Sequence, residues 1–307
     1  MTATESRFSY IDVAKGIAML LVVMHHCGGS LDRGMEVLTM TDVPLFFVCS
    51  GYLAYKQTIN YSKEVIKKIK GILVPFIIVL ILITVIRGIN VVDIFVNDIT
   101  KLGYWFLEAL FLIYLLWWGT TALCNNRVGR LIFVGGAEVL LLLAAKFSSS
   151  MIDNIFCLSS LARYYPCFIA GVMMREYNVE SLNRYVGLIF LCISIVGFSN
   201  ISGSKNLTFL LCVGAYIFSA VLLFYFIKYI ESSIPSILHK MLTHLGKYSL
   251  SIYIIHFFFV PKVPSFLPDA FVFNFTYSLI TAIIVSYLSL LTGRFLSLTT
   301  PLNKVLR

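Results

Sequence analysis

The chain has 307 residues, 59% of them hydrophobic and 13% charged, with a formal net charge of +9 and a mean hydropathy of +0.89. A soluble globular domain has about 25% charged residues because its surface faces water, so this composition excludes a soluble fold of this size. Long apolar runs recur from Ile11 to Leu296. We therefore expect an all-α, polytopic membrane protein.

The distribution of polar residues excludes several other classes. The first apolar run has Asp12 and Lys15 near its start and no Ala-x-Ala-like exit, which indicates a retained span and not a cleaved secretory signal. The seven cysteines are scattered without a Cys-x-x-Cys pair, so neither a zinc site nor a disulfide framework is predicted. An excess of lysine and arginine usually marks the cytoplasmic loops of membrane proteins, so we expect no nucleic-acid partner.

A membrane-spanning helix needs about 20 mostly apolar residues. The sequence predicts about ten such helices, at residues 11–28, 41–56, 71–89, 103–123, 129–147, 152–174, 185–200, 207–230, 247–263 and 273–297. The second is short and the sixth is interrupted by Arg163 and Pro166, so the number can change by about one pair. With a cytoplasmic N-terminus, 17 of the 24 lysines and arginines lie on the cytoplasmic side, 6 on the other and Arg163 within a span. We expect both termini to be cytoplasmic, and a single membrane domain over residues 1–307.

The first span carries four polar residues, and a charged side chain inside a bilayer costs about 2.5–3.5 kcal/mol. At 100° per residue, Asp12, Lys15 and His26 fall within an arc of about 60°, whereas His25 points about 100° away from His26. Lys15 and His26 are separated by about 16 Å along the helix axis. This stripe therefore runs from the cytoplasmic surface into the outer half of the membrane, and we interpret His26 as the candidate for catalysis and His25 as a packing or supporting residue.

A structural interpretation of the same residues is also open. Asp12 and Lys15 lie close enough to the inner interface to snorkel or to pair at i,i+3. His26 can simply hydrogen-bond a neighbouring helix. Periodicity alone does not separate these roles from catalysis.

The second span begins at Asp42, and Pro44 fits the start of a helix. Ser50-Gly51 lets another backbone come close, as small residues do in membrane helices. Helix packing is the simpler interpretation of this pair. Tyr52 follows it directly and is a candidate for a cavity.

A lysine-rich segment leads into the third span. Lys63, Lys67 and Lys70 are spaced i, i+4 and i+7 and share one helix face at the inner membrane surface. This face is either a positive anchor attracted to anionic lipid, which is the simpler interpretation, or a clamp for the phosphates of a cytosolic ligand.

Further polar residues are candidates for a wet cavity. Trp105 near the outer end of the fourth span fits an ordinary aromatic belt, but Glu108, three residues deeper, needs a partner or water. Arg163 precedes Pro166, which can free a carbonyl group for a ligand. His256 lies nine residues past Lys247, well into the membrane, and either acts in function or braces a helix.

Taken together, these stretches resemble acyltransferase family 3, bacterial membrane enzymes that decorate cell-surface glycans. Five segments carry the resemblance in the family's order: the first helix from Tyr10 to His26, Pro44-Leu-Phe-Phe-Val-Cys-Ser-Gly-Tyr52, the Lys67–Pro75 run, Tyr104-Trp-Phe-Leu-Glu108 and Gly246-Lys-Tyr-Ser-Leu-Ser-Ile-Tyr-Ile-Ile-His256. The family's spacing of a basic residue, ten positions and a histidine assigns Lys15 and His26. Lysines stand where many members have arginine, and lysine lacks the bidentate fork that arginine offers to phosphate.

The resemblance implies transfer of an acyl group, most often acetyl, from cytosolic acyl-CoA to a hydroxyl of an extracytoplasmic or lipid-linked glycan. His26 then serves as general base, Asp12 and Ser50 assist it, and Lys15 with Lys63, Lys67 and Lys70 binds the donor. A cavity or acceptor role is implied for the remaining candidates: His25, Tyr52, Trp105, Glu108, Arg163 and His256. The expected location is the bacterial inner membrane, with acyl-CoA as co-substrate and no permanently bound cofactor or metal. A proton-coupled transporter or flippase and a non-catalytic scaffold are the alternatives.

Overall fold

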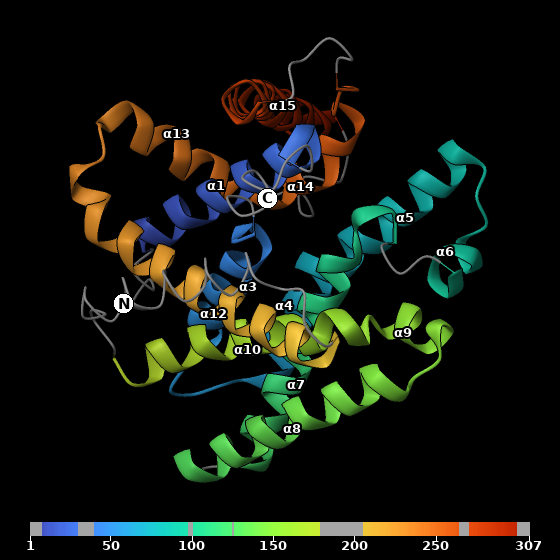
Figure 1. The fold of residues 1–307 in the computed structure, drawn as a ribbon, viewed down its shortest axis with the longest axis vertical. Coiled ribbons are helices and arrows are strands. Elements are labelled where there is room, and N and C mark those ends of the chain that lie inside the picture. Colours follow the sequence, from blue (N-terminus) through green and yellow to red (C-terminus); the bar gives the residue numbers. More distant parts are fainter. Residues whose placement is uncertain are drawn as a thin grey trace. The chain divides into compact units, whose positions relative to one another are not determined.

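The computed structural model describes residues 8–29, 40–97, 101–124, 126–178, 205–263 and 270–299. Every regular element within these ranges is a helix, and they contain no strand. The helices are drawn in Figure 1 in chain order from blue to red. Several are long and apolar enough to cross a bilayer, so the chain is a multi-pass, all-helical membrane protein.

Six of the described helices pass as membrane spans by length and hydropathy. They are α1 (Ser9–Met24) continued by η1 (His25–Gly29), α4 (Tyr61–Lys68) continued by η2 (Ile69–Leu73) and α5 (Val74–Arg87), α7 (Trp105–Leu123), α8 (Arg127–Phe147), α12 (Lys205–Ile230) and α15 (Phe271–Thr299). A bent pair makes a seventh candidate, because α9 (Ser150–Phe156) and α10 (Leu158–Glu176) meet at 43°.

The other described helices are shorter. They are α3 (Asp42–Ala54), α6 (Val91–Asn97), η3 (Lys101–Gly103), η4 (Glu231–Ser233), α13 (Ser236–Lys247), α14 (Ser249–Ile255) and η5 (His256–Phe258). Two of these, α3 and α14 with η5, are apolar but below the length of a full span. Neither α6 nor α13 corresponds to a predicted span.

The third and sixth predicted spans differ from the helices observed. The third begins at Tyr61, so the lysine-rich segment and the apolar segment form one helix with a π-helical stretch at Ile69–Leu73. The sixth predicted span, whose apolar run Arg163 and Pro166 interrupt, is a bent pair: α10 runs through both residues, and the bend lies at Cys157, where φ is +51°. The span predicted at 185–200 lies outside the described residues, so the number ten and the cytoplasmic termini stay predictions.

The chain divides into two compact units, each described by itself. Unit 1 comprises residues 1–49 and 178–307, and unit 2 comprises residues 50–177. Of the helices, unit 1 holds α1, α12 to α15 and most of α3, and unit 2 holds α4 to α10.

Unit 1 is organised around α1, which is flanked by α13 and α15 (Figure 1). A Cβ atom at Gly246 of α13 would overlap the carbonyl oxygen of Asp12, and one at Gly16 of α1 would overlap that of Leu242. Close approach of two backbones requires such small residues. This contact fixes the first half of α1 and with it the register of the polar stripe.

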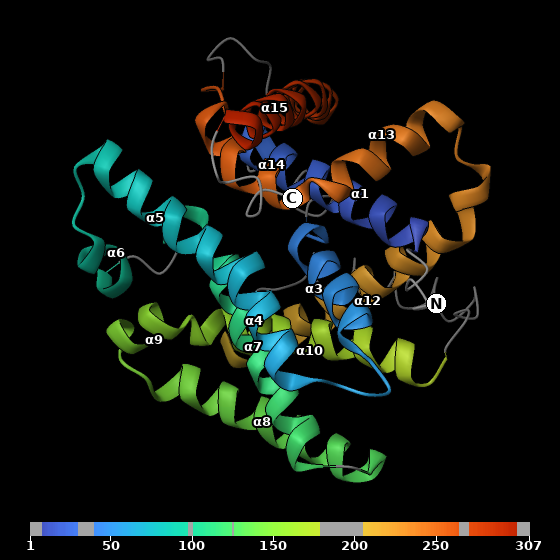
Figure 2. The same cartoon turned by 180° about the vertical axis from the view of Figure 1, so that it is seen from behind.

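Unit 2 is organised around α7, which buries most of its length, and α10 packs on it. The last turn of α3 approaches α10 closely, since a Cβ atom at Gly51 would overlap the carbonyl oxygen of Phe168. Figure 2 shows α8 alongside α7 and α10. Leu141 is the single buried residue of α8, so most of the α8 surface is left to lipid.

The Gly246 contact gives a stability prediction. We expect Gly246→Val to lower the unfolding temperature in detergent by several degrees, because overpacking costs about 1–3 kcal/mol. Gly136→Val in α8 is the matched control, since a Cβ atom there meets nothing within 4 Å. Equal losses from both substitutions, measured by thermal unfolding, would contradict the close packing of α1 on α13.

Candidate active site

The predicted polar stripe lies on a helix that is buried along most of its length. Asp12 is buried, with 7% of its surface exposed, and Lys15 is half-buried. Among the described residues no ion pair joins Lys15 to a carboxylate. The pairing of Asp12 with Lys15, which the sequence left open, is therefore not seen.

The second half of the stripe ends in a π-helical turn. This turn, η1, begins at His25, and its Gly28 has φ of +150° and ψ of 7°, a backbone conformation that glycine adopts readily. Single π-helical turns within α-helices often occur at functional sites. The turn follows the end of α1 at Met24 and contains both histidines.

His26 is exposed although α1 is otherwise mostly buried. Its ring lies beside two residues of η5: the ring centroid of His256 is 5.3 Å away and that of Phe257 is 4.7 Å away. Residues 230 positions apart in sequence therefore meet here. An exposed imidazole with a second imidazole beside it is suited to proton transfer.

His256 is fully buried. Its Nδ1 lies 2.8 Å from the carbonyl oxygen of Tyr253 and 3.2 Å from that of Ile252. No described residue hydrogen-bonds its Nε2. The two contacts of Nδ1 hold the ring in place, as expected of a residue that braces a helix. Nε2 is left available for function.

His25 points to a different partner. Its Nδ1 lies 3.9 Å from a carboxylate oxygen of Asp42 at the start of α3, and its ring centroid is 5.7 Å from that of His26. His25 therefore lies near both the Asp42 carboxylate and the His26 ring, and its supporting role stays a prediction.

Ser50 and Tyr52, at the end of α3, are both buried. The carbonyl oxygen of Ser50 accepts a hydrogen bond from the hydroxyl of Tyr114 at 3.2 Å. The hydroxyl of Tyr52 accepts one from the guanidinium of Arg175, also at 3.2 Å. These contacts show that the end of α3 is packed against other helices.

The three lysines predicted to share a face, Lys63, Lys67 and Lys70, are all exposed. Sequence reasoning passed over Lys68, which is half-buried, with its Nζ 3.8 Å from the centre of the Tyr114 ring. On a helix, a residue next to Lys67 points about 100° away from it, and this is the signal that separates Lys68 from the exposed face.

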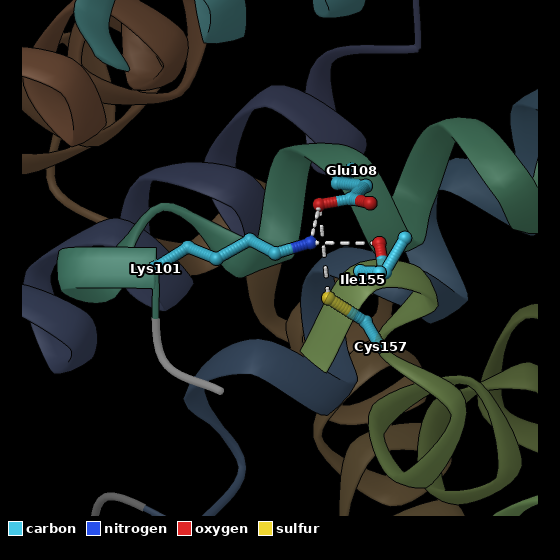
Figure 3. Close-up of polar contacts among 4 residues, drawn as sticks. All are labelled: Lys101, Glu108, Ile155 and Cys157. Carbon is cyan, nitrogen blue, oxygen red and sulfur yellow. Dashed lines mark hydrogen bonds and ion pairs between the residues drawn. The ribbon is translucent and has the colours of Figure 1, made fainter. Parts of the chain in front are cut away.

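Glu108 has a partner that the sequence did not predict. Figure 3 shows the Nζ of Lys101 between the Glu108 carboxylate and the carbonyl oxygen of Ile155, which lies at 3.0 Å, and the Cys157 thiol 3.8 Å from the same carboxylate. Lys101 is fully buried. The need of an intramembrane glutamate for a partner was the available signal.

Trp105 and Arg163 are both half-buried. The indole of Trp105 stacks on the ring of Tyr164, with centroids 5.3 Å apart and planes at 22°. Arg163 precedes Tyr164 on α10. Trp105 is therefore part of an aromatic stack and is not an isolated residue of an aromatic belt.

The candidate residues are thus divided between the units. Unit 1 holds Asp12 and Lys15 on α1 and brings together the histidines of η1 and η5, which are His25, His26 and His256. Unit 2 holds the other candidates: Ser50, Tyr52, the lysine face, Trp105, Glu108 and Arg163. Nowhere in the described ranges do three histidine, cysteine, aspartate or glutamate side chains gather as metal ligands.

Comparison with known protein families gives a match over most of the chain. The family described as "Acyltransferase domain" matches residues 8–293. No curated protein and no solved structure matches the chain. The matched range contains every candidate residue named above.

Proposed function

Since the chain belongs to acyltransferase family 3, and is therefore a membrane acyltransferase, we propose that it moves an acyl group, acetyl in the first instance, from cytosolic acyl-CoA to a hydroxyl of an extracytoplasmic or lipid-linked glycan. The observation that carries this proposal is His26, an exposed imidazole beside His256 at the end of a mostly buried helix. The proposed location is the bacterial inner membrane, with both termini in the cytoplasm and about ten spans.

In the proposed reaction His26 acts as general base on the acceptor. The neutral ring takes the proton of the sugar hydroxyl while that oxygen attacks the thioester carbonyl carbon. The new C–O bond forms and the C–S bond breaks, and the departing CoA thiolate receives the proton from the His26 imidazolium. The exposure of the His26 side chain supports this role, because a base must be reached by its substrate.

Other residues are proposed to assist this step. Asp12 and Lys15 extend the polar stripe of α1 towards the donor side, and Ser50 or Tyr52 donates to the oxyanion that develops on the carbonyl. For Tyr52 the support is that Arg175 donates a hydrogen bond to its hydroxyl and so holds the phenol in place. Trp105, Glu108 and Arg163 are proposed to contribute to the acceptor side, where an aromatic face suits a sugar ring.

The test is direct. Purified protein in bilayers, given radiolabelled acetyl-CoA and extracted membrane glycans, should release CoA and label the glycan. Counterflow of substrate without release of CoA would show a transporter instead and would overturn the proposal.

The exposed lysine face, Lys63, Lys67 and Lys70, is proposed to bind the phosphates of CoA. We expect Lys67→Gln with Lys70→Gln to raise the KM for acetyl-CoA about tenfold at low salt and to leave kcat nearly unchanged. For the native protein, KM should rise with added salt, because exposed charges are screened beyond about 10 Å at 0.1 M ionic strength.

Steady-state kinetics at two salt concentrations checks this prediction. Lys146→Gln is the matched control. Lys146 is also an exposed lysine, but it lies in the last turn of α8, whereas the lysine face lies on α4 and η2. If the double variant loses activity equally at all salt concentrations and through kcat, the lysine face has a structural role.

A further inference from the structure

The contacts of His256 fix its tautomer. Nδ1 lies within hydrogen-bonding distance of the carbonyl oxygens of Tyr253 and Ile252, at 2.8 and 3.2 Å. A carbonyl oxygen can only accept, so Nδ1 carries the ring proton and donates it. Nε2 therefore presents a lone pair and acts as an acceptor.

This acceptor is buried without a donor. His256 is 0% exposed, and its Nε2 has no hydrogen-bond partner in the part of the chain that the structure describes. Buried polar atoms are nearly always hydrogen-bonded, and an exception calls for a functional or solvent explanation. A group that brings an N–H or O–H to this nitrogen is thus expected.

The ring of His26 does not hydrogen-bond this nitrogen in the structure, but it is a neighbouring side chain that can supply an N–H to it. Its ring centroid lies 5.3 Å from that of His256, with the planes at 36°. Two imidazoles joined by an N–H···N hydrogen bond have centroids about 5 Å apart, so the rings are within reach of one another. Phe257 packs against both, at 4.7 Å from His26 and 4.1 Å from His256, and covers part of the pair.

We propose that His256 is a positioning residue for His26. When the His26 ring turns to bring one N–H into line, Nε2 of His256 accepts a hydrogen bond from it, and the lone pair of the other His26 nitrogen is left for the acceptor hydroxyl. When His26 takes the proton of that hydroxyl, the imidazolium keeps its hydrogen bond to His256 until the proton passes to the CoA thiolate. This inference rests on the proposed function, in which His26 is the base.

Two substitutions separate the two nitrogens of His256. Asparagine places its amide near the position of Nδ1, so His256→Asn can still donate to the Tyr253 carbonyl but offers no acceptor at the ε position. Glutamine reaches further, and His256→Gln places an amide oxygen near the position of Nε2. Both are polar and of similar size, so each is a control for the other.

We expect His256→Asn to lower kcat for CoA release from acetyl-CoA by about 100-fold with KM unchanged, and His256→Gln to stay within about tenfold of the native enzyme. If His256 had only a structural role, both variants would yield less folded protein. The loss of kcat would then not depend on whether an acceptor is present at the ε position. Equal kcat values for the two variants would overturn the positioning role.

A second measurement is independent of activity. In the ¹⁵N spectrum of histidine-labelled protein in bilayers, the proposal expects the Nε2 resonance of His256 to report an accepted hydrogen bond and to move in His26→Ala. An unmoved resonance overturns the inference. If His26→Ala abolishes CoA release but the resonance stays in place, only the pairing fails, whereas full activity of His26→Ala refutes the proposed function itself.

Discussion

His26→Ala should abolish acyl transfer and leave a folded, membrane-inserted protein. General acid–base catalysis by a positioned side chain contributes about 10²–10⁴ to the rate, so we expect CoA release from acetyl-CoA to fall by at least that factor. Because the side chain is exposed, its truncation removes little buried surface. The yield and unfolding temperature should therefore stay close to those of the native protein.

The comparison variant is His239→Ala. His239 lies on α13, where its Nε2 is 3.2 Å from the Glu231 carboxylate and 3.2 Å from the Ser9 hydroxyl, and it has no part in the proposed chemistry. This variant should keep its activity, which would show that loss of any histidine from unit 1 is not enough to abolish acyl transfer. Full activity of purified His26→Ala would refute the assignment of the base.

Lys101→Met is expected to have the largest effect on stability. Lys101 is fully buried and holds the Glu108 carboxylate and the Ile155 carbonyl oxygen, as Figure 3 shows. Removing one partner of a buried ion pair leaves an uncompensated charge and costs about 3–5 kcal/mol. The unfolding temperature in detergent should fall accordingly, and the contact between η3, α7 and α9 should loosen.

The double variant Lys101→Met with Glu108→Leu tests the cause. It removes both charges, and replacing a buried ion pair by apolar residues is often neutral, so it should recover most of the lost stability. Lys146→Met, which changes an exposed lysine, should have little effect. A double variant as unstable as Lys101→Met would show that the lysine acts through packing and not through its charge.

The helical elements of this fold were predicted best where apolar residues continue without interruption. The predicted spans at 103–123, 129–147 and 207–230 agree closely with α7, α8 and α12. Composition predicts the class of protein, and hydropathy predicts these helices. Both work because a span must present apolar side chains to lipid over the full thickness of the bilayer. The bend at Cys157 could not be predicted, since it depends on a left-handed backbone conformation at a residue that is neither glycine nor asparagine.

The candidate site was predicted in its residue types and not in its pairings. Helical periodicity placed Lys15 and His26 on one stripe, but the meeting of His26 with His256 is a tertiary contact between α1 and the end of α14. The same holds for Lys101 and Glu108, which follow from the turn at η3, where φ is positive at Lys101 and Leu102. Local sequence can indicate that an intramembrane glutamate needs a partner, but it does not identify the partner, and the functional roles of all these residues stay predictions.

The exposure of α8 ties this helix to the thickness of the membrane. With 21 residues it is about 31 Å long, close to the hydrocarbon thickness of about 30 Å, so it fits nearly upright. By contrast, α15 has 29 residues and measures about 43 Å, so it must tilt or extend into the headgroup region. A thinner bilayer would tilt α8 against α10, whose Glu176 pairs with Arg130 of α8, so we expect these two helices to adjust together.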